Sequence, residues 1–178
     1  MNSVIIAASA GCGKTTLAQK YPDIVAYIES SVYKYLLGTM TKAEIEAAKH
    51  TKREDNPDFP HNYIDAIINA GKTHKIVCVW LNRIILPEYD RHGIPYILCY
   101  PDHEAVMEYR QRFIDRGNND LFINHVMDTY DYYIDQWETM PGEKIVLHKG
   151  ETLESRLEVI YETDSDRHIR IRKEYQSP

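Results

Sequence analysis

Cysteine is scarce in this sequence, which excludes a fold held together by disulfides. The 178 residues contain three cysteines, an odd number, and two of them, Cys78 and Cys99, fall inside apolar runs. Buried reduced thiols of this kind are typical of a protein that works in a reducing compartment. We therefore expect a cytoplasmic protein.

Long apolar runs are missing as well. No stretch approaches the roughly 20 apolar residues that a membrane-spanning helix needs, and nothing before Val4 resembles a signal peptide. These absences predict a soluble protein without a membrane partner. The length suits a single domain whose sheet is covered on both faces.

Basic residues are also fewer than acidic ones. The sequence has 21 basic and 27 acidic residues, which gives a formal net charge of -6. A protein whose main partner is a nucleic acid backbone needs the opposite balance. We therefore expect the partner to be a small molecule and not a nucleic acid. The sequence does not indicate an oligomeric state.

Glycine is used only eight times, yet two of the eight lie in one short turn. The segment Ala8–Thr15 reads ASAGCGKT and fits the broad form of the phosphate-binding loop, with Ala8 where the stricter motif has its first glycine. Gly11 and Gly13 let successive backbone N–H groups point inward at the start of a helix, which is the geometry that a polyphosphate needs. A strand before the turn and a helix-permissive stretch after it provide the context that the motif requires.

This loop predicts which residues hold ATP and Mg²⁺. Lys14 is expected to reach the β- and γ-phosphates, and the Thr15 hydroxyl is expected to hold the metal ion. The residues predicted to contact the nucleotide are Ser9, Ala10, Gly11, Cys12, Gly13, Lys14, Thr15 and Thr16.

Apolar runs alternate with helical patterns along the chain, as in a parallel sheet with crossover helices. Strands are predicted over Val4–Ala8, Ile24–Ile28, Ile76–Leu81, Tyr96–Tyr100 and Lys144–Leu147. Helices are predicted over Thr15–Lys20, Asn62–Ala70, His103–Arg116, Asp120–Trp137 and Thr152–Tyr161. The pattern indicates an α/β fold with one domain over residues 1–163.

Two stretches fall outside this alternation. Residues 39–61 form an insertion that contains a charged helical segment, Thr41–Asp55, and more chain than a simple crossover needs. The insertion can fold over the edge of the sheet as a substrate cover, or its charged part can be a solvated surface helix. In the basic tail, residues 164–178, arginines alternate with isoleucines, which predicts an added edge strand or a disordered end.

Charged and polar side chains follow the predicted strands at the edge where ligands bind in open parallel sheets. Glu29, Ser30 and Ser31 follow the second strand, and Arg83 follows the third. We expect Glu29 and Arg83 to face the phosphate that is transferred, and the two serines to contact the acceptor. Arg83 can also be an ordinary solvated arginine at the start of a helix.

A short arginine-bearing segment, residues 108–119, has the properties of a lid. Arg112 and Arg116 are four residues apart and share one face of a helix, whereas Arg110 points elsewhere and is kept as a candidate substrate contact. Planar guanidinium groups suit phosphate oxygens, so Arg112 and Arg116 are predicted to be catalytic. Gly117 provides a flexible joint after them. An ordinary ion-paired surface helix is the alternative.

Two missing motifs narrow the class of enzyme. The third strand ends at Asn82, where a motor-type ATPase or a GTPase needs an aspartate that directs Mg²⁺, and the guanine-reading N-K-x-D motif is absent. Phosphoryl transfer by a small kinase needs neither feature, because it depends on positioned phosphates, Mg²⁺ and cations that screen charge in the transition state. The pattern therefore favours a kinase.

From Val4 to Leu147 the chain resembles the small P-loop kinases of the nucleoside monophosphate kinase superfamily. The likeness rests on ASAGCGKTT after the first strand, the insertion after Glu29, and RQRFIDRGN between the fourth and fifth strands. The resemblance implies a P-loop NTPase fold with a five-stranded parallel sheet in the order 2-3-1-4-5 and helices on both faces. It also implies ATP as the donor and an acceptor held between insertion and lid. The arginine segment looks, too, like the lid of shikimate and gluconate kinases, which phosphorylate a hydroxyl.

These observations lead to one hypothesis and two alternatives. The hypothesis is an ATP- and Mg²⁺-dependent kinase of a nucleoside monophosphate or a related phosphorylated metabolite, in which Glu29 orients Mg²⁺ or the substrate. The first alternative is a kinase of a hydroxyl acceptor, such as a nucleoside, a sugar or a polynucleotide end, in which Glu29 is the base. The second is a nucleotide-binding regulator that turns ATP over slowly and in which the lid arginines are structural.

Overall fold

A sheet of five parallel strands forms the centre of the computed structural model, which describes residues 3–38, 53–163 and 166–171, with side chains up to residue 157. The strands are β1 (Val4–Ala8), β2 (Val25–Tyr27), β3 (Ile76–Trp80), β4 (Tyr96–Pro101) and β5 (Lys144–Leu147). Their order across the sheet is β2-β3-β1-β4-β5, and every neighbouring pair is parallel. The α/β class and the strand order predicted from the sequence are confirmed.

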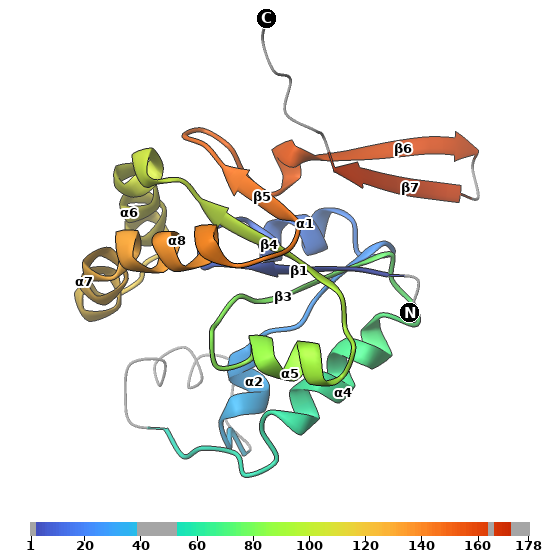
Figure 1. The fold of residues 1–178 in the computed structure, drawn as a ribbon, viewed down its shortest axis with the longest axis horizontal. Coiled ribbons are helices and arrows are strands. Elements are labelled where there is room, and N and C mark those ends of the chain that lie inside the picture. Colours follow the sequence, from blue (N-terminus) through green and yellow to red (C-terminus); the bar gives the residue numbers. More distant parts are fainter. Residues whose placement is uncertain (1–2, 39–52, 164–165, 172–178) are drawn as a thin grey trace, which may run out of the picture.

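Strand β1, at the centre of the sheet, is covered on both faces. Ile5 and Ile6 are at most 1% exposed, and Ala7 and Ala8 are fully buried. Successive side chains of a strand point to opposite faces, so burial of all four requires cover on each side. Figure 1 shows α1 (Lys14–Lys20) behind the sheet and α8 (Tyr130–Thr139) in front of it.

The helices bury the apolar side of a helical repeat. Helix α4, for example, buries Tyr63, Ile64 and Ile67 and exposes Asp65 and Asn69. The other helices are α2 (Ser30–Lys34), α5 (Leu86–Arg91), α6 (Val106–Asp115) and α7 (Asp120–Asp128), with α4 itself spanning His61–Ala70 and short 3₁₀ turns η1 (His103–Ala105) and η2 (Glu154–Arg156). Among the described residues, no helix is both long and apolar enough to cross a membrane.

The single helix predicted over Asp120–Trp137 is in fact two helices, α7 and α8. They are separated at Thr129, whose backbone leaves the helical region with φ -110° and ψ 4°. The Thr129 hydroxyl donates to the carbonyl of His125 at 2.8 Å, a side-chain bond that competes with the helical ladder. The Tyr130 hydroxyl then donates to the carbonyl of Asp102 at 2.9 Å, which ties the start of α8 to the end of β4.

The last predicted helix, Thr152–Tyr161, is wrong. The chain makes the short turn η2 and then strand β6 (Leu157–Thr163), which pairs antiparallel with β7 (Asp166–Ile171) in a separate two-stranded sheet. The alternation in the tail did indicate a strand, but its partner is the segment just before it and not the edge of the main sheet. The domain boundary predicted at residue 163 therefore falls inside a hairpin.

The insertion is described only in part, and most of the predicted helix Thr41–Asp55 lies outside the described residues. Asp55 forms an antiparallel bridge with Tyr35, and the amide of Leu36 donates to the carbonyl of Glu54 at 2.9 Å. These contacts join the two ends of the insertion just beyond α2. Arg53 is consequently placed next to the carboxyl edge of the sheet.

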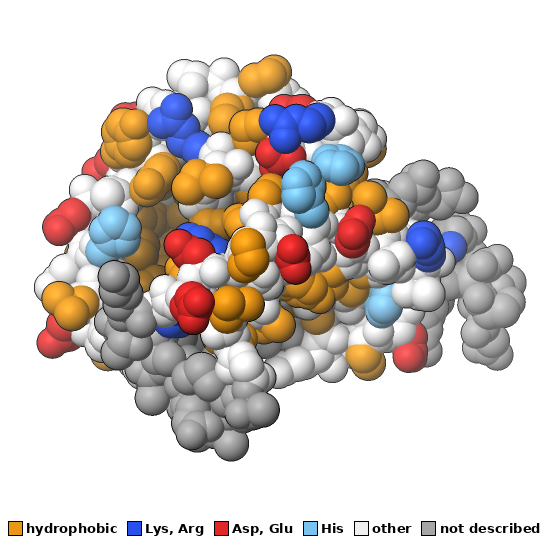
Figure 2. Space-filling view, turned by 90° about the horizontal axis from the view of Figure 1, so that it is seen from below, with side chains coloured by type: hydrophobic (Ala, Val, Ile, Leu, Met, Phe, Trp, Pro, Cys, Tyr) orange, Lys and Arg blue, Asp and Glu red, His pale blue; other side chains and the backbone are white. Residues whose placement is uncertain are grey.

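Charges of both signs are mixed over the surface. On the face drawn in Figure 2, the acidic and basic side chains of the described residues are interspersed and do not gather in one basic patch. This distribution agrees with the formal net charge of -6.

Candidate active site

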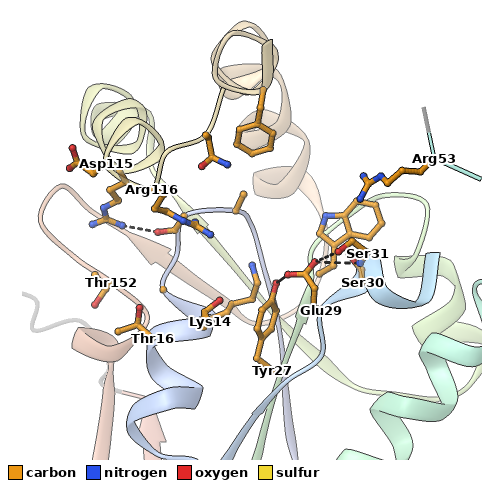
Figure 3. Close-up of a pocket in the computed structure, with 18 residues that line it drawn as sticks. Lys14, Thr16, Tyr27, Glu29, Ser30, Ser31, Arg53, Asp115, Arg116 and Thr152 are labelled. Carbon is orange, nitrogen blue, oxygen red and sulfur yellow. Dashed lines mark hydrogen bonds between the residues drawn. The ribbon is translucent and has the colours of Figure 1, made fainter. Parts of the chain in front are cut away.

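A cavity of about 720 Å³ lies at the carboxyl ends of the central strands, beside the glycine loop, residues 8–15. Figure 3 shows how the loop, the start of α2, Arg53 and the end of α6 surround it. Its charged lining consists of Lys14, Arg53, Arg112 and Arg116 together with the carboxylates of Glu29 and Asp115. Cations outnumber carboxylates here, although the whole chain is acidic, so the cavity suits an anionic ligand.

The glycine loop has a backbone that only glycine adopts readily. Gly11 has φ +83°, and Gly13, the residue before α1, has φ +95°. A Cβ atom on Gly11 would also lie 2.9 Å from the Cδ1 atom of Tyr109 on α6. Two separate constraints, the positive φ and the close ring, therefore keep position 11 free of a side chain.

Lys14 folds back into this loop. Its ammonium group donates to the carbonyls of Ala8 at 2.8 Å and Ser9 at 2.7 Å, and it lies 5.7 Å from the centre of the Tyr27 ring. Burial lowers the pKa of Lys14, whose residue is 8% exposed. An ammonium group has three N–H donors, so two loop carbonyls leave one donor for a ligand in the cavity.

Ser9 and Cys12, two loop residues predicted to contact the nucleotide, are buried and do not line the cavity. Cys12 is fully buried, and its sulfur lies 3.0 Å from the hydroxyl oxygen of Ser9 and 3.5 Å from that of Tyr109. Their side chains therefore support the loop from the core. The remaining predicted nucleotide contacts, Ala10, Gly11, Gly13, Lys14, Thr15 and Thr16, all line the cavity.

Glu29 faces the cavity as predicted, with Ser30 and Ser31 beside it. Its Oε1 accepts from the amide of Ser31 at 3.3 Å and from the Ser31 hydroxyl at 3.1 Å, and its Oε2 accepts from the Tyr27 hydroxyl at 2.5 Å. Burial alone would raise the pKa of Glu29, but the hydrogen bonds from Tyr27 and Ser31 outweigh burial and hold this pKa below its ordinary value. Glu29 is therefore ionised at neutral pH.

The two lid arginines have different surroundings. Arg112 donates to the carbonyl of Gly11 at 3.1 Å and to that of Glu151 at 2.7 Å, and it forms an ion pair with Glu108. Arg116, one turn later, lines the cavity, and its side chain makes no hydrogen bond or ion pair with the described residues. Figure 3 shows its guanidinium group pointing toward Lys14. Arg112 thus holds the loop against α6, and Arg116 is the arginine available to a ligand.

Two predicted substrate contacts lie outside the cavity. Strand β3 ends at Trp80, before Arg83, so Trp80 lines the cavity at the strand end and Arg83 does not. The guanidinium group of Arg83 instead donates to the hydroxyl of Tyr132 on α8 at 3.1 Å. Arg110 is exposed and does not line the cavity.

Several cavity residues were missed by sequence reasoning, among them Tyr27, Arg53, Trp80, Asn118, Phe122 and Thr152. Arg53 stacks on Tyr35, with its guanidinium carbon 3.7 Å from the ring centre, and its Nη1 atom is buried without a hydrogen-bond partner. The sequence placed Arg53 in the charged helical segment Thr41–Asp55, whereas Arg53 and Glu54 lie outside helices and strands in the structure. Trp80 could have been found, because the predicted strand Ile76–Leu81 ends one residue after it, and moving that boundary by one residue places Trp80 at the strand end.

Comparison with known proteins does not assign the chain to a family. No protein-family model matches the chain, and no curated protein matches it either. The resemblance noted in the sequence therefore rests on the loop motif, the arginine segment and the insertion alone.

The constraint on Gly11 gives a prediction about stability. Gly11→Ala should lose about 1 to 2 kcal/mol for the unfavourable φ and about 1 to 3 kcal/mol more for displacing the Tyr109 ring. Gly93→Ala is the matched control, because Gly93 has φ +62° and an added Cβ would meet nothing within 4 Å. Urea unfolding measures both variants. Equal losses would show that the contact between Gly11 and Tyr109 is unimportant.

Proposed function

We propose that the protein is an ATP- and Mg²⁺-dependent phosphotransferase of the P-loop NTPase fold, whose acceptor is a nucleoside monophosphate or a related phosphorylated small molecule. One observation carries the proposal: a single cavity joins the glycine loop at one end to Arg53, whose Nη1 atom has no hydrogen-bond partner, at the other, with Arg116 and Glu29 also on its wall. A donor phosphate and an anionic acceptor therefore have separate cationic positions in one cavity.

The donor end fits the triphosphate of ATP. The positive φ values of Gly11 and Gly13 shape the loop as a nest for anions, and Lys14 adds a charged donor. The exposed residue Thr15 lines the cavity, and its hydroxyl is an oxygen ligand of the kind that suits Mg²⁺. Bound Mg²⁺ would neutralise part of the negative charge on the phosphates.

The acceptor end fits a phosphate attached to a flat ring. Arg53 lines this end of the cavity, and its buried Nη1 atom has no hydrogen-bond partner. A planar guanidinium group binds phosphate oxygens through parallel hydrogen bonds. Ser30 and Ser31 offer hydroxyl groups on the same side of the cavity, and Trp80 offers an aromatic surface. A nucleotide has the phosphate and the aromatic base that such a lining would accept.

The surroundings of Glu29 favour a phosphate acceptor over a hydroxyl. A hydroxyl acceptor must lose a proton as it attacks, and a carboxylate base works best when its pKa is raised toward neutrality. Both oxygens of Glu29 already accept hydrogen bonds, and its pKa is lowered. A monophosphate is already an anion at neutral pH and needs no base.

The reaction then depends on charge and position. An oxygen of the acceptor phosphate attacks the γ-phosphorus of ATP, the bond to the β-phosphate oxygen breaks, and ADP leaves. Lys14 stays with the phosphates of the donor, and Arg116 is placed to screen the charge that spreads over the transferring group. Arg53 holds the acceptor phosphate in line with the bond that breaks.

A nucleotide-binding regulator is the second candidate, because Arg112 is committed to the loop. Its contacts with Gly11, Glu108 and Glu151 are those of a structural arginine. A protein in which Arg116 were structural as well would bind ATP and turn it over slowly.

The phosphotransferase proposal predicts the effect of removing the lysine charge. Lys14→Met keeps most of the apolar side chain and should slow transfer by about 10²-fold or more, because the charge on the donor phosphates is no longer screened. The assay follows ATP consumption by 31P NMR with a panel of nucleoside monophosphates, nucleosides and sugars. Lys20→Met, on the exposed side of α1, is the matched control and should keep full activity. A folded Lys14→Met variant with normal turnover would contradict the proposal.

The two arginines separate the kinase from the regulator. Arg112→Ala should destabilise the fold by about 1 to 3 kcal/mol, since it removes hydrogen bonds to the loop. Arg116→Ala should change stability by less than about 0.5 kcal/mol and slow transfer by about 10²-fold, with little change in ATP affinity. Thermal unfolding, steady-state kinetics and a nucleotide titration test this. Unchanged slow turnover in Arg116→Ala would favour the regulator.

The role of Glu29 predicts how far the rate of transfer falls when its charge is removed. Glu29→Gln keeps the size of the side chain and removes the charge. Loss of a general base slows a reaction by roughly 10² to 10⁴-fold. If Glu29 orients Mg²⁺ or substrate instead, the rate of transfer to a monophosphate should fall by less than this. Single-turnover kinetics with the preferred acceptor measures the loss. Two results together would support the hydroxyl kinase instead. The variant would bind both substrates but be inactive, and the wild-type product would be a phosphorylated hydroxyl.

A further inference from the structure

Tyr27 stands between the two charged groups at the centre of the cavity. It is the last residue of β2, and its side chain lines the cavity between the glycine loop and Glu29. Its ring lies 5.7 Å from the ammonium group of Lys14, and its hydroxyl donates to Glu29 Oε2 at 2.5 Å. Figure 3 shows the phenol pointing at the Glu29 carboxylate with Lys14 alongside. One side chain therefore contacts both the donor end and the carboxylate.

The hydrogen bond from Tyr27 differs from the other two that Glu29 accepts. Both bonds from Ser31 go to Oε1 and are local, because Glu29 is the residue before α2 and binds the first turn of that helix. Tyr27 alone binds Oε2 among the described residues, and it does so from a strand of the main sheet. A carboxylate held through one oxygen can still turn its other oxygen, whereas bonds at both oxygens fix its plane.

We propose that Tyr27 is a positioning residue, which holds the Glu29 carboxylate in a fixed orientation inside the cavity and keeps it from turning onto the cations that serve the phosphates. The role rests on the proposed phosphotransferase function. The ammonium group of Lys14 lies 5.7 Å from the centre of the Tyr27 ring, and Arg116 lines the same cavity. A Glu29 side chain free to pair with either one would neutralise a charge that the reaction needs.

The groups around Glu29 make its own titration a direct readout of this contact. Lys14, on the loop side, favours the charged form of Glu29. Tyr63 on α4 donates to the carbonyl of Ile28, next to Glu29, and Arg116, directly after α6, lines the same cavity as Tyr27 and Glu29. Burial and the Glu29 charge raise the pKa of Tyr27, so the phenol keeps its proton over the whole working range. A donor that favours the charged carboxylate lowers its pKa, and loss of that donor must raise it.

The first test measures Glu29 in the ligand-free protein. Carboxyl 13C NMR of Glu-labelled wild type and Tyr27→Phe follows the protonation of Glu29. We expect its pKa to rise in Tyr27→Phe toward the ordinary value of a glutamate. Tyr132→Phe is the matched control, because it removes an exposed tyrosine hydroxyl bonded to Arg83 outside the cavity, and it should leave Glu29 unchanged. An unshifted Glu29 in Tyr27→Phe would overturn the proposal.

The second test uses transfer kinetics. Tyr27→Phe should lower kcat about tenfold, the effect of one charge-assisted hydrogen bond, with KM for ATP unchanged. The acid limb of the kcat profile should move to higher pH, because Glu29 is active as the anion and its pKa has risen. In the Glu29→Gln background, Tyr27→Phe should have no further effect on kcat. Additive losses in the double variant would show that Tyr27 acts independently of Glu29.

The two tests decide different claims, so a negative result in one does not determine the other. If no acceptor is phosphorylated, the phosphotransferase function is wrong, while the Glu29 titration still decides whether Tyr27 holds the carboxylate. If Tyr27→Phe does not fold, the wild type remains informative: the Cζ resonance of Tyr27 should shift at the same pH at which Glu29 gains a proton. Independent titration of the two side chains would contradict the contact.

Discussion

The glycine loop keeps its shape because other parts of the chain bind it from outside. Helix α6 places the Tyr109 ring against Gly11 at a distance that leaves no room for a side chain, and Arg112 donates to the Gly11 carbonyl. On the other side, the amide of Leu153 donates to the carbonyl of Cys12 at 2.9 Å. The loop carbonyls are thus used by the protein itself. These contacts therefore also fix the shape of the cavity in front of the loop.

The same contacts explain why the segment after β5 does not form the predicted helix. Residue Leu153 must present its amide to the loop, and Thr152 lines the cavity across from Gly13. The hydroxyl and amide of Ser155 close a turn on Thr152, which uses up the backbone groups that a helix would need. Helical spacing of leucines could not reveal the partner of Leu153, because Cys12 comes from the opposite end of the chain.

Much of the fold could be predicted, because its signals are local. Strands β1 and β5 have the predicted bounds, and the order of the five strands follows from the loop motif and its resemblance to small kinases. Glu29 was placed correctly by the strand-end rule. The same rule misplaced Arg83, since β3 ends at Trp80 and the next residues turn toward α5.

The acceptor end of the cavity could be predicted least well. Arg53 comes from an irregular stretch and reaches the cavity through a bridge between Tyr35 and Asp55, a pairing that no periodicity announces. Tyr27 was assigned to a strand but not to a site, because a tyrosine in an apolar run is usually core. Residues of this kind acquire a role only when distant segments meet in the folded chain.

The central claim is that the glycine loop binds the phosphates of MgATP. The most direct measurement follows the backbone amide resonances of Gly11, Gly13 and Lys14 during a titration of the 15N-labelled protein with MgATP. We expect all three to shift and to saturate in the range of about 1 μM to 1 mM that is usual for enzyme substrates, while the amide of Gly142, in a distant turn, stays still. Loop amides that do not move, or that move no more than Gly142, would contradict the account.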